Sequence, residues 1–306
     1  MPALLLVSPE PLSGKTTLAA GLAQRLKEQG RSVALLRLEG DEHAAADAAL
    51  FASLPFNTQR HSQPLNAAAV LDAAKGADVA LVEAPVGDPS GLLSSLGEVR
   101  ALVVASGASP DQVARYCEAL GDRLAGLVLN RVPSRRCDAI RTAFEAVGLR
   151  PLLLLAEDRT LAAPALGQVA EAIQARARFL NSNKTRLLDR PLIASISADP
   201  GQDYFARYQP SAVIVRGDKP DQQLAALNAG VSCLIVTGGW TPLSYVLDRA
   251  EEDEIPILQT EMDTIDTVRR IEAMFATAPF IGGDAKLGRL MEMLGEIEVS
   301  ALAGAN

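Results

Sequence analysis

Short, uninterrupted apolar runs recur along the first half of the chain, and most of them alternate with segments of helical periodicity. The runs are residues 3–7, 32–38, 79–82, 101–105, 126–129 and 151–155. A strand that is apolar on both faces has to be buried on both faces, as in a parallel sheet covered by helices above and below. The pattern therefore predicts a doubly wound, mostly parallel α/β domain over residues 1–178.

The second half of the chain predicts a smaller α/β domain over residues 191–277, after a polar linker at 179–190. Strands are expected at 192–196, 212–215, 233–237 and 257–259, and helices at 222–228, 243–252 and 264–274. Residues 278–306 are expected to form a helical tail, with a helix at 284–294 and an Ala- and Gly-rich end that is compatible with disorder.

The composition argues against several classes of partner. The 306 residues carry a net charge of −8, whereas binding to nucleic acid or to anionic membranes draws on clustered Lys and Arg. No apolar run reaches the roughly 18–20 residues that cross a bilayer. Cys117, Cys137 and Cys233 lack metal-ligand spacing and are expected to be reduced. We therefore expect a cytoplasmic protein that binds neither nucleic acid nor membrane.

Residues 8–17, with the sequence SPEPLSGKTT, lie between the first apolar run and the first helical segment. Gly14, Lys15 and Thr16 match the second half of the phosphate-binding motif Gly-x4-Gly-Lys-Ser/Thr, while Pro9 stands at the first glycine position. Backbone N–H groups of residues 13–17 would face a phosphate, Lys15 would reach the β- and γ-phosphates, and the Thr16 hydroxyl would ligate Mg²⁺. The loop predicts ATP and Mg²⁺ as ligands; the alternative is a strand–turn–helix with a chance Gly-Lys-Thr.

Two carboxylates are candidates for the same metal ion. Glu83 follows the run at 79–82, where the end of a parallel strand can present a ligand for Mg²⁺ or its water; the alternative is a carboxylate that faces solvent. Asp47 lies in a helical stretch and is a further candidate, with Asp41 and Glu39 as competitors and a solvated helix charge as the alternative.

Asn130 follows the run at 126–129, and its amide can donate to and accept from the edge of an adenine base, unless it only forms a turn. The complete predicted site has Lys15 and Glu83 as catalytic residues, Glu10, Leu12, Ser13, Gly14, Lys15, Thr16, Thr17 and Asn130 for the nucleotide, and Thr16, Asp47 and Glu83 for the metal.

The segment Thr237-Gly238-Gly239-Trp240 follows an apolar run in the second half. Its glycines allow close approach of a ligand or partner, or else form a tight turn. Trp240, the only tryptophan, is expected in the core rather than at an interface. Asp218 is expected to cap the following helix rather than to orient a ligand.

The motifs SPEPLSGKTT, DVALVEAPVG and GLVLNRVP resemble those of the dethiobiotin synthetase family. The chain to about residue 275 is similar, over a wider span, to the N-terminal regulatory region of long bacterial phosphate acetyltransferases, which joins such a domain to a DRTGG domain. The segments that carry this resemblance are AEDRTLAAPALGQVAEAI (156–173), GDKPDQQLAALNAG (217–230), CLIVTGG (233–239) and MDTIDTVRRIE (262–272).

The departures from these families limit what the resemblance implies. Arg37-Leu38 stands where dethiobiotin synthetases have a lysine-proline pair that holds the diamine substrate, and Ala84-Pro85 replaces a glycine-rich turn. Lys219 stands where the arginine that gives the DRTGG domain its name is common. The chain ends about where the acetyltransferase domain would begin, so we expect a regulatory module that does not transfer acetyl groups by itself. The resemblance also implies a homodimer or a higher homo-oligomer.

Three functions remain open at this point. The first is an ATP- and Mg²⁺-binding regulator whose DRTGG domain reads out the nucleotide state or binds a small-molecule effector. The second is an ATP-dependent ligase acting on a small carboxylate or amine, or a slow ATPase. The third is an interaction partner of a separate phosphate acetyltransferase with a relic P-loop. The sequence leaves open ATP hydrolysis, the effector, the base preference and the stoichiometry.

Overall fold

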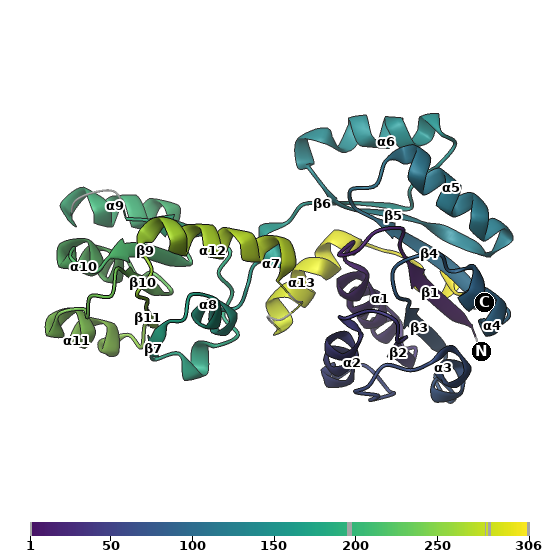
Figure 1. Cartoon of the computed structure of the whole chain (residues 1–306), viewed down its shortest axis with the longest axis horizontal. Coiled ribbons are helices and arrows are strands. Elements are labelled where there is room, and N and C mark those ends of the chain that lie inside the picture. Colours follow the sequence, from purple (N-terminus) through teal and green to yellow (C-terminus); the bar gives the residue numbers. More distant parts are fainter. Residues whose placement is uncertain (1, 195–197, 279, 281–282, 305–306) are drawn as a thin grey trace. The chain divides into compact units, whose positions relative to one another are not determined.

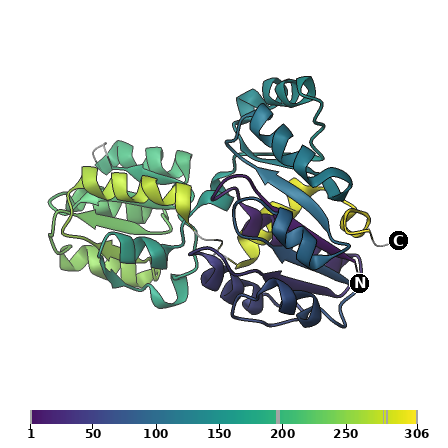
Figure 2. The ribbon, with the colours of Figure 1, turned by 45° about the vertical axis from the view of Figure 1, so that its right-hand side comes forward.

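The computed structural model describes residues 2–194, 198–278, 280 and 283–304, and the chain divides into two compact units (Figures 1 and 2). The first unit comprises Met1–Asp158 together with Leu287–Asn306, and the second comprises Arg159–Lys286. The chain therefore leaves the first unit after Asp158 and returns to it at Leu287, so that the second unit is an insertion in the first.

The first unit is built on a parallel sheet with the strand order β2-β3-β1-β4-β5-β6. Its strands are β1 (Ala3–Val7), β2 (Val33–Arg37), β3 (Val79–Glu83), β4 (Arg100–Ala105), β5 (Leu124–Val132) and β6 (Leu153–Ala156). Every residue of β1, β2 and β3 is buried, as expected for strands that are apolar on both faces. The predicted α/β fold of this unit is confirmed.

Helices cover both faces of this sheet. One face packs against α3 (Ala67–Ala73), α4 (Ser90–Leu96), α5 (Pro110–Leu120) and α6 (Cys137–Ala146), whose buried side chains share a core with alternate strand residues. Because successive strand residues point to opposite faces, α1 (Lys15–Glu28) belongs to the other face, where it contacts β1, β2 and β3. The helix α2 (Ala44–Ser53) packs against β2.

The C-terminal tail packs on α1. A Cβ placed on Gly21 of α1 would lie 2.5 Å from Leu290 Cδ2 and 2.8 Å from Leu294 Cδ1, so α13 (Gly283–Leu294) approaches α1 closely there. The predicted tail helix is therefore present. A further short helix, α14 (Val299–Leu302), follows with Val299 buried, which the sequence did not indicate; residues 305–306 lie outside the described part.

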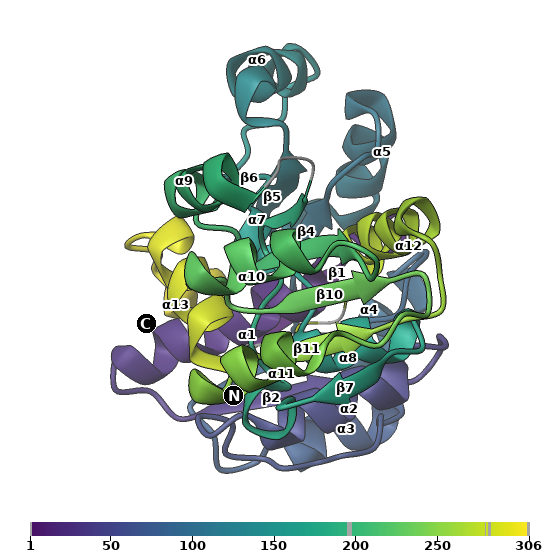
Figure 3. The same ribbon diagram turned by 90° about the vertical axis from the view of Figure 1, so that its left-hand side faces the viewer.

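The second unit has a mixed sheet with the order β7-β11-β10-β9-β8. Figure 3 labels three neighbouring strands of this sheet, β7, β11 and β10. Its strands are β7 (Arg176–Arg178), β8 (Pro191–Ile193), β9 (Ala212–Arg216), β10 (Leu234–Thr237) and β11 (Ile257–Gln259), and only β7 is antiparallel to its neighbour among these strands. One face packs against α9 (Ala198–Tyr208), α10 (Pro220–Asn228) and α11 (Ser244–Glu252), and the other against α8 (Leu166–Ala172) and α12 (Thr264–Thr277). Part of the strand predicted at 192–196 falls on residues 195–197, outside the described residues.

The division between the units lies earlier in the chain than the predicted boundary at residue 178. The short helix α7 (Arg159–Ala162) and α8 belong to the second unit, where the apolar side chains of α8 share a core with β9, β10 and α12. The stretch expected to be a linker contains a 3-10 helix at Asn181–Asn183, and the buried Leu188 packs in the same core. Within the described residues, no helix is long and apolar enough to cross a membrane.

Candidate functional site

The loop between β1 and α1 lies at the carboxyl edge of the first sheet. Gly14 adopts φ +90°, and a Cβ there would collide with the side chain of Asn130, so only glycine fits this position. The helix begins with a 3.0 Å hydrogen bond from Leu18 N to the Gly14 carbonyl oxygen. Of the other predicted loop residues, Leu12 is 46% exposed with φ +52°, and Thr17 is half-buried in the first turn of α1.

Two side chains hold this loop in place. The Glu10 carboxylate accepts hydrogen bonds from the backbone N–H groups of Ser106 and Gly107, which follow β4; the bond from Gly107 is 2.9 Å long. Asn130, on β5, donates from Nδ2 to the Ser13 carbonyl oxygen at 2.9 Å. Both Glu10 and Asn130 were predicted to bind nucleotide. The structure gives each a contact that shapes the loop, and direct binding of a nucleotide by either residue stays a prediction.

Lys15 and Thr16 open α1 and lie beside Glu83. Lys15 is only 5% exposed; burial lowers the pKa of its ammonium group, and the Glu83 carboxylate partly offsets this effect. Thr16 Oγ1 donates to Glu83 Oε1 at 3.1 Å. Ser13 Oγ is buried and has no hydrogen-bond partner among the described residues. A buried hydroxyl without a partner is costly, so this atom indicates a place for a polar ligand atom.

Glu83, the last residue of β3, is 3% exposed. Burial raises the pKa of its carboxyl group to about 7, against the opposing attraction of Arg37. Its Oε1 atom accepts the bond from Thr16 and lies 3.9 Å from Arg37 Nε, whereas Oε2 has no hydrogen-bond partner in the described part of the chain. A buried carboxylate oxygen without a donor suits coordination of a hard divalent cation.

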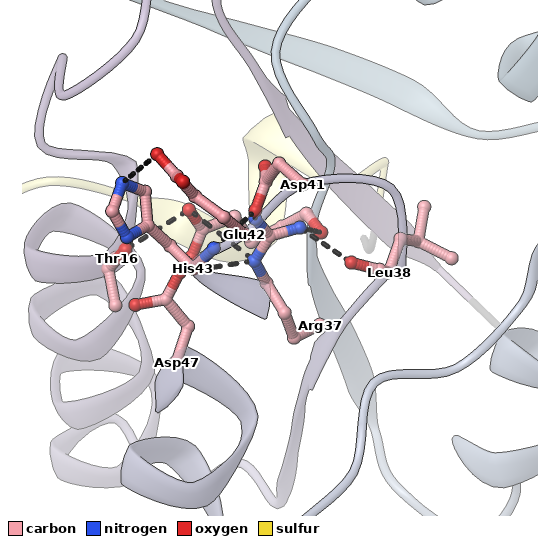
Figure 4. Close-up of polar contacts among 8 residues, drawn as sticks. Thr16, Arg37, Leu38, Asp41, Glu42, His43 and Asp47 are labelled. Atoms are coloured by element: carbon pink, nitrogen blue, oxygen red, sulfur yellow. Dashed lines mark hydrogen bonds and ion pairs between the residues drawn. The ribbon is translucent and has the colours of Figure 1, made fainter. Parts of the chain in front are cut away.

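Arg37, the last residue of β2, is the centre of an ion-pair cluster (Figure 4). Its Nη2 donates to both carboxylate oxygens of Asp41 at 2.6 Å, its Nε to Asp47 Oδ2 at 3.3 Å, and its Nη1 to the Leu38 carbonyl oxygen at 2.6 Å. Burial alone would lower the pKa of Arg37, but the carboxylates of Glu83, Asp41 and Asp47 outweigh burial and raise it. The guanidinium group is therefore held by the protein's own acceptors.

The structure brings the predicted metal ligands together in part. Thr16 and Glu83 are hydrogen-bonded neighbours, whereas Asp47 is bound to Arg37. Among the residues that the structure describes, no three His, Cys, Asp or Glu side chains gather as a metal-binding group. The central position of Arg37 was not anticipated, although a charged residue closing an otherwise apolar strand is a signal for such a cluster.

Two predictions about the second unit are wrong. Trp240, expected in the core, is 62% exposed because it lies on the loop beyond β10 rather than on the strand. Asp218, expected to cap α10, instead pairs with Arg216, whose Nε donates to Asp218 Oδ1 at 2.9 Å. Lys219 occupies the capping position of α10 without a side-chain hydrogen bond.

The sheet order, together with the Gly-Lys-Thr loop between β1 and α1, defines the first unit as a P-loop nucleotide-binding α/β domain. The family model of the CobQ/CobB/MinD/ParA nucleotide binding domain matches residues 7–168, and the chain belongs to this family. The model of the DRTGG domain matches residues 168–274, which confirms that part of the resemblance inferred from the sequence.

Individual relatives match only parts of the chain. The cobalt-dependent inorganic pyrophosphatase of Clostridium perfringens is 24% identical over 109 residues, which are 36% of this chain and 19% of that protein. The chain thus spans about a fifth of the length of that relative.

Two solved structures are similar to parts of the chain. One holds the CBS and DRTGG domains of the regulatory region of the Clostridium perfringens pyrophosphatase, complexed with the activator diadenosine tetraphosphate; it has 20% identity, covers 41% of this chain and 52% of that chain, and has a TM-score of 0.33. The other is the MinC:MinD cell division protein complex of Aquifex aeolicus. It has 16% identity, covers 53% of this chain and 83% of that chain, and has a TM-score of 0.41.

Proposed function

We propose that the first unit binds ATP with Mg²⁺ and that the chain is a regulatory protein, similar to the regulatory region of phosphate acetyltransferases, in which the DRTGG domain reads out the nucleotide state. The observation that carries the proposal is a pair of buried oxygens, Ser13 Oγ and Glu83 Oε2, that have no hydrogen-bond partner among the described residues. Ser13 stands two residues before Lys15 in the loop, and Glu83 accepts a hydrogen bond from Thr16. This donor set fits a polyphosphate and a divalent cation.

The residues would share the ligand in a defined way. The N–H groups of the loop and the Lys15 ammonium group would hold the β- and γ-phosphates, and Ser13 Oγ would donate to a phosphate oxygen. Thr16 Oγ1 and Glu83 would supply the protein's ligands to Mg²⁺, which usually keeps several waters and phosphate oxygens. A bound cation would neutralise charge on the phosphates. Asp47 would act through Arg37 rather than touch the metal.

The ion-pair cluster favours a regulator over a ligase. Arg37 stands where the resemblance to dethiobiotin synthetases would place a substrate-binding lysine. Its guanidinium group already donates to the carboxylate oxygens of Asp41 at 2.6 Å. A substrate carboxylate would have to displace this internal carboxylate. We further propose a cytoplasmic homodimer or higher homo-oligomer, with a small-molecule effector at the DRTGG domain.

A second candidate function is an ATP-dependent ligase of the dethiobiotin synthetase kind. The observation that favours it is Glu83, because a pKa of about 7 is typical of groups that exchange protons during catalysis. Under this alternative Lys15 would stabilise the transferring phosphoryl group. A relic P-loop in a partner of a separate phosphate acetyltransferase is the third candidate.

Titration calorimetry with ATP and Mg²⁺ tests the proposal. We expect binding by the unmodified protein, and for Lys15→Ala a loss of at least about tenfold in affinity, since a charged hydrogen bond to phosphate contributes about 1.5–3 kcal/mol. Lys27→Ala is the matched control, because Lys27 lies exposed on the same helix and should leave binding unchanged. Absence of binding by the unmodified protein would refute the proposal, and turnover that depends on one small carboxylate or amine would favour the ligase.

A further inference from the structure

The second unit contains a cavity of about 390 Å³ at the carboxyl ends of β9 and β10, beside the first residues of α12. It lies where two separate segments meet, 217–230 and 233–239, which carry the resemblance to the DRTGG signature. The side chains that matter for its chemistry are Arg216, Asp218, Trp240, Asp263 and Ile265. Its volume falls within the range of small-molecule sites in proteins.

A glycine lets Trp240, which lines this cavity, approach the end of β9 closely. A Cβ on Gly217 would collide with the Cβ of Trp240 and would lie 3.1 Å from its Cγ, so the base of the tryptophan side chain lies directly against Gly217. Trp240 remains 62% exposed, and Ile265, which also lines the cavity, is 63% exposed. Two large apolar side chains left uncovered on one cavity offer a surface on which a flat ring can stack.

The charges around this cavity disfavour an anionic ligand. Asp263 accepts a 2.8 Å hydrogen bond from Asp266 N, so the N-terminus of α12 is already capped by a carboxylate. The Arg216 guanidinium is engaged by Asp218 in two hydrogen bonds of 2.9 and 2.6 Å. The carboxylate of Glu261 lies beside Gly239, where a Cβ would meet it. The charged groups that line the cavity are thus two carboxylates, those of Asp218 and Asp263, and one guanidinium, that of Arg216, so the surplus of charge among them is negative.

We propose that this cavity binds a small, planar aromatic cation, with its ring on the Trp240 indole and its charge near Asp263. An indole face attracts a cation, and a carboxylate at the rim adds to this attraction. The proposal rests on the effector role proposed above for the second unit, but it needs no nucleotide in the first unit.

Three probes of nearly equal shape and different charge test the proposal: benzamidinium, benzamide and benzoate. Trp240 is the only tryptophan of the chain, so its emission, excited at 295 nm, reports on this cavity alone. We expect benzamidinium to change the emission saturably, benzamide to bind more weakly, and benzoate to have no saturable effect. Ligand-observed NMR provides a second readout that does not depend on the fluorophore.

Variants separate the contributions of charge and ring. Asp263→Asn keeps a good helix cap and removes one charge, and should weaken benzamidinium about fivefold, the factor for two unit charges about 4 Å apart in water. Glu251→Gln, an exposed position on α11, is the matched control and should have no effect. Trp240→Leu, followed by NMR, should lose most of the binding.

Two results would overturn the proposal: benzoate binding as tightly as benzamidinium, or no saturable binding of benzamidinium by either readout. Unchanged affinity in Asp263→Asn would equally contradict it. The Lys15→Ala variant should still bind benzamidinium, since Lys15 belongs to the first unit. A failure of nucleotide binding and a failure of this inference can therefore be told apart in the same samples.

Discussion

Glu83→Gln should make the first unit more stable at pH 8 while it weakens the site. Glu83 is 3% exposed, and its pKa rises from 4.5 to about 7 in the folded protein because burial penalises the ionised carboxylate. This rise corresponds to about 3 kcal/mol against the ionised form. Glutamine has nearly the same shape and carries no charge to desolvate.

The pH dependence has a defined sign. A carboxyl group with a raised folded pKa binds its proton more tightly in the folded than in the unfolded state. Its favourable contribution to folding is therefore complete below pH 4.5 and is lost as the pH rises through about 7. Between pH 5 and pH 8 the free energy of unfolding of the unmodified protein should fall by about 2.5 kcal/mol because of this group. The free energy of unfolding of Glu83→Gln should not show this fall.

Urea unfolding at the two pH values, followed by far-ultraviolet circular dichroism, measures this difference. Trp240 lies in the second unit, so the transition without a change in tryptophan emission belongs to the first unit. Glu145→Gln, at an exposed position on α6, controls for a general change in charge. The reasoning is refuted if Glu83→Gln is no more stable than the unmodified protein at pH 8. It is also refuted if the variant's gain in stability over the unmodified protein is as large at pH 5 as at pH 8. Calorimetry should show weaker binding of ATP and Mg²⁺ by this variant.

Three further changes test contacts of the first unit. Asn130→Ala removes the hydrogen bond to Ser13 and should cost about 1 kcal/mol of stability. By calorimetry it should weaken the affinities for ATP and GTP by the same factor. A changed ratio of the two affinities would instead favour recognition of the base by Asn130. In urea unfolding, Gly21→Ala should cost about 1–3 kcal/mol of stability through overpacking. Adding Leu290→Ala to this variant should recover part of that loss. If the losses of stability from the two single changes simply add in the double variant, the contact is contradicted. Arg37→Met should cost on the order of 3 kcal/mol by leaving carboxylates unpaired in the same assay, and a neutral result would show that these carboxylates do not depend on Arg37.

The strands and the phosphate-binding loop could be predicted because their signals are local. A fully apolar run such as Leu4–Val7 has one stable environment, a sheet covered on both faces, and Gly14 to Thr16 carry their chemistry in their order. The edge strand β7 could not be found in this way, because its residues, Arg176–Arg178, are all exposed and form no apolar run. Its strand conformation comes from antiparallel pairing with β11, which is a tertiary effect.

The polar contacts within the sites were also beyond local signals. The sequence identifies Arg37 and Asp47 as charged, but only the fold brings Asp47 and Glu83, from separate elements, to Arg37. Trp240 was expected in the core because its side chain is large and hydrophobic. Its burial depends on whether another segment packs over its loop, and the local sequence carries no signal for that; in the structure Trp240 is exposed. Asp218 likewise accepts a hydrogen bond from the guanidinium of Arg216 instead of capping the N-terminus of the helix that follows it.

The order of synthesis follows from the insertion of the second unit. A ribosome completes residues 159–286 before it makes the segment that packs on Gly21 of α1. Because domains tend to fold as they emerge, we expect the DRTGG unit to be folded while the nascent P-loop unit still lacks Leu290 and Leu294. The helix that starts at Lys15 is translated before the second unit, yet it would gain its full set of neighbours only after that unit is complete.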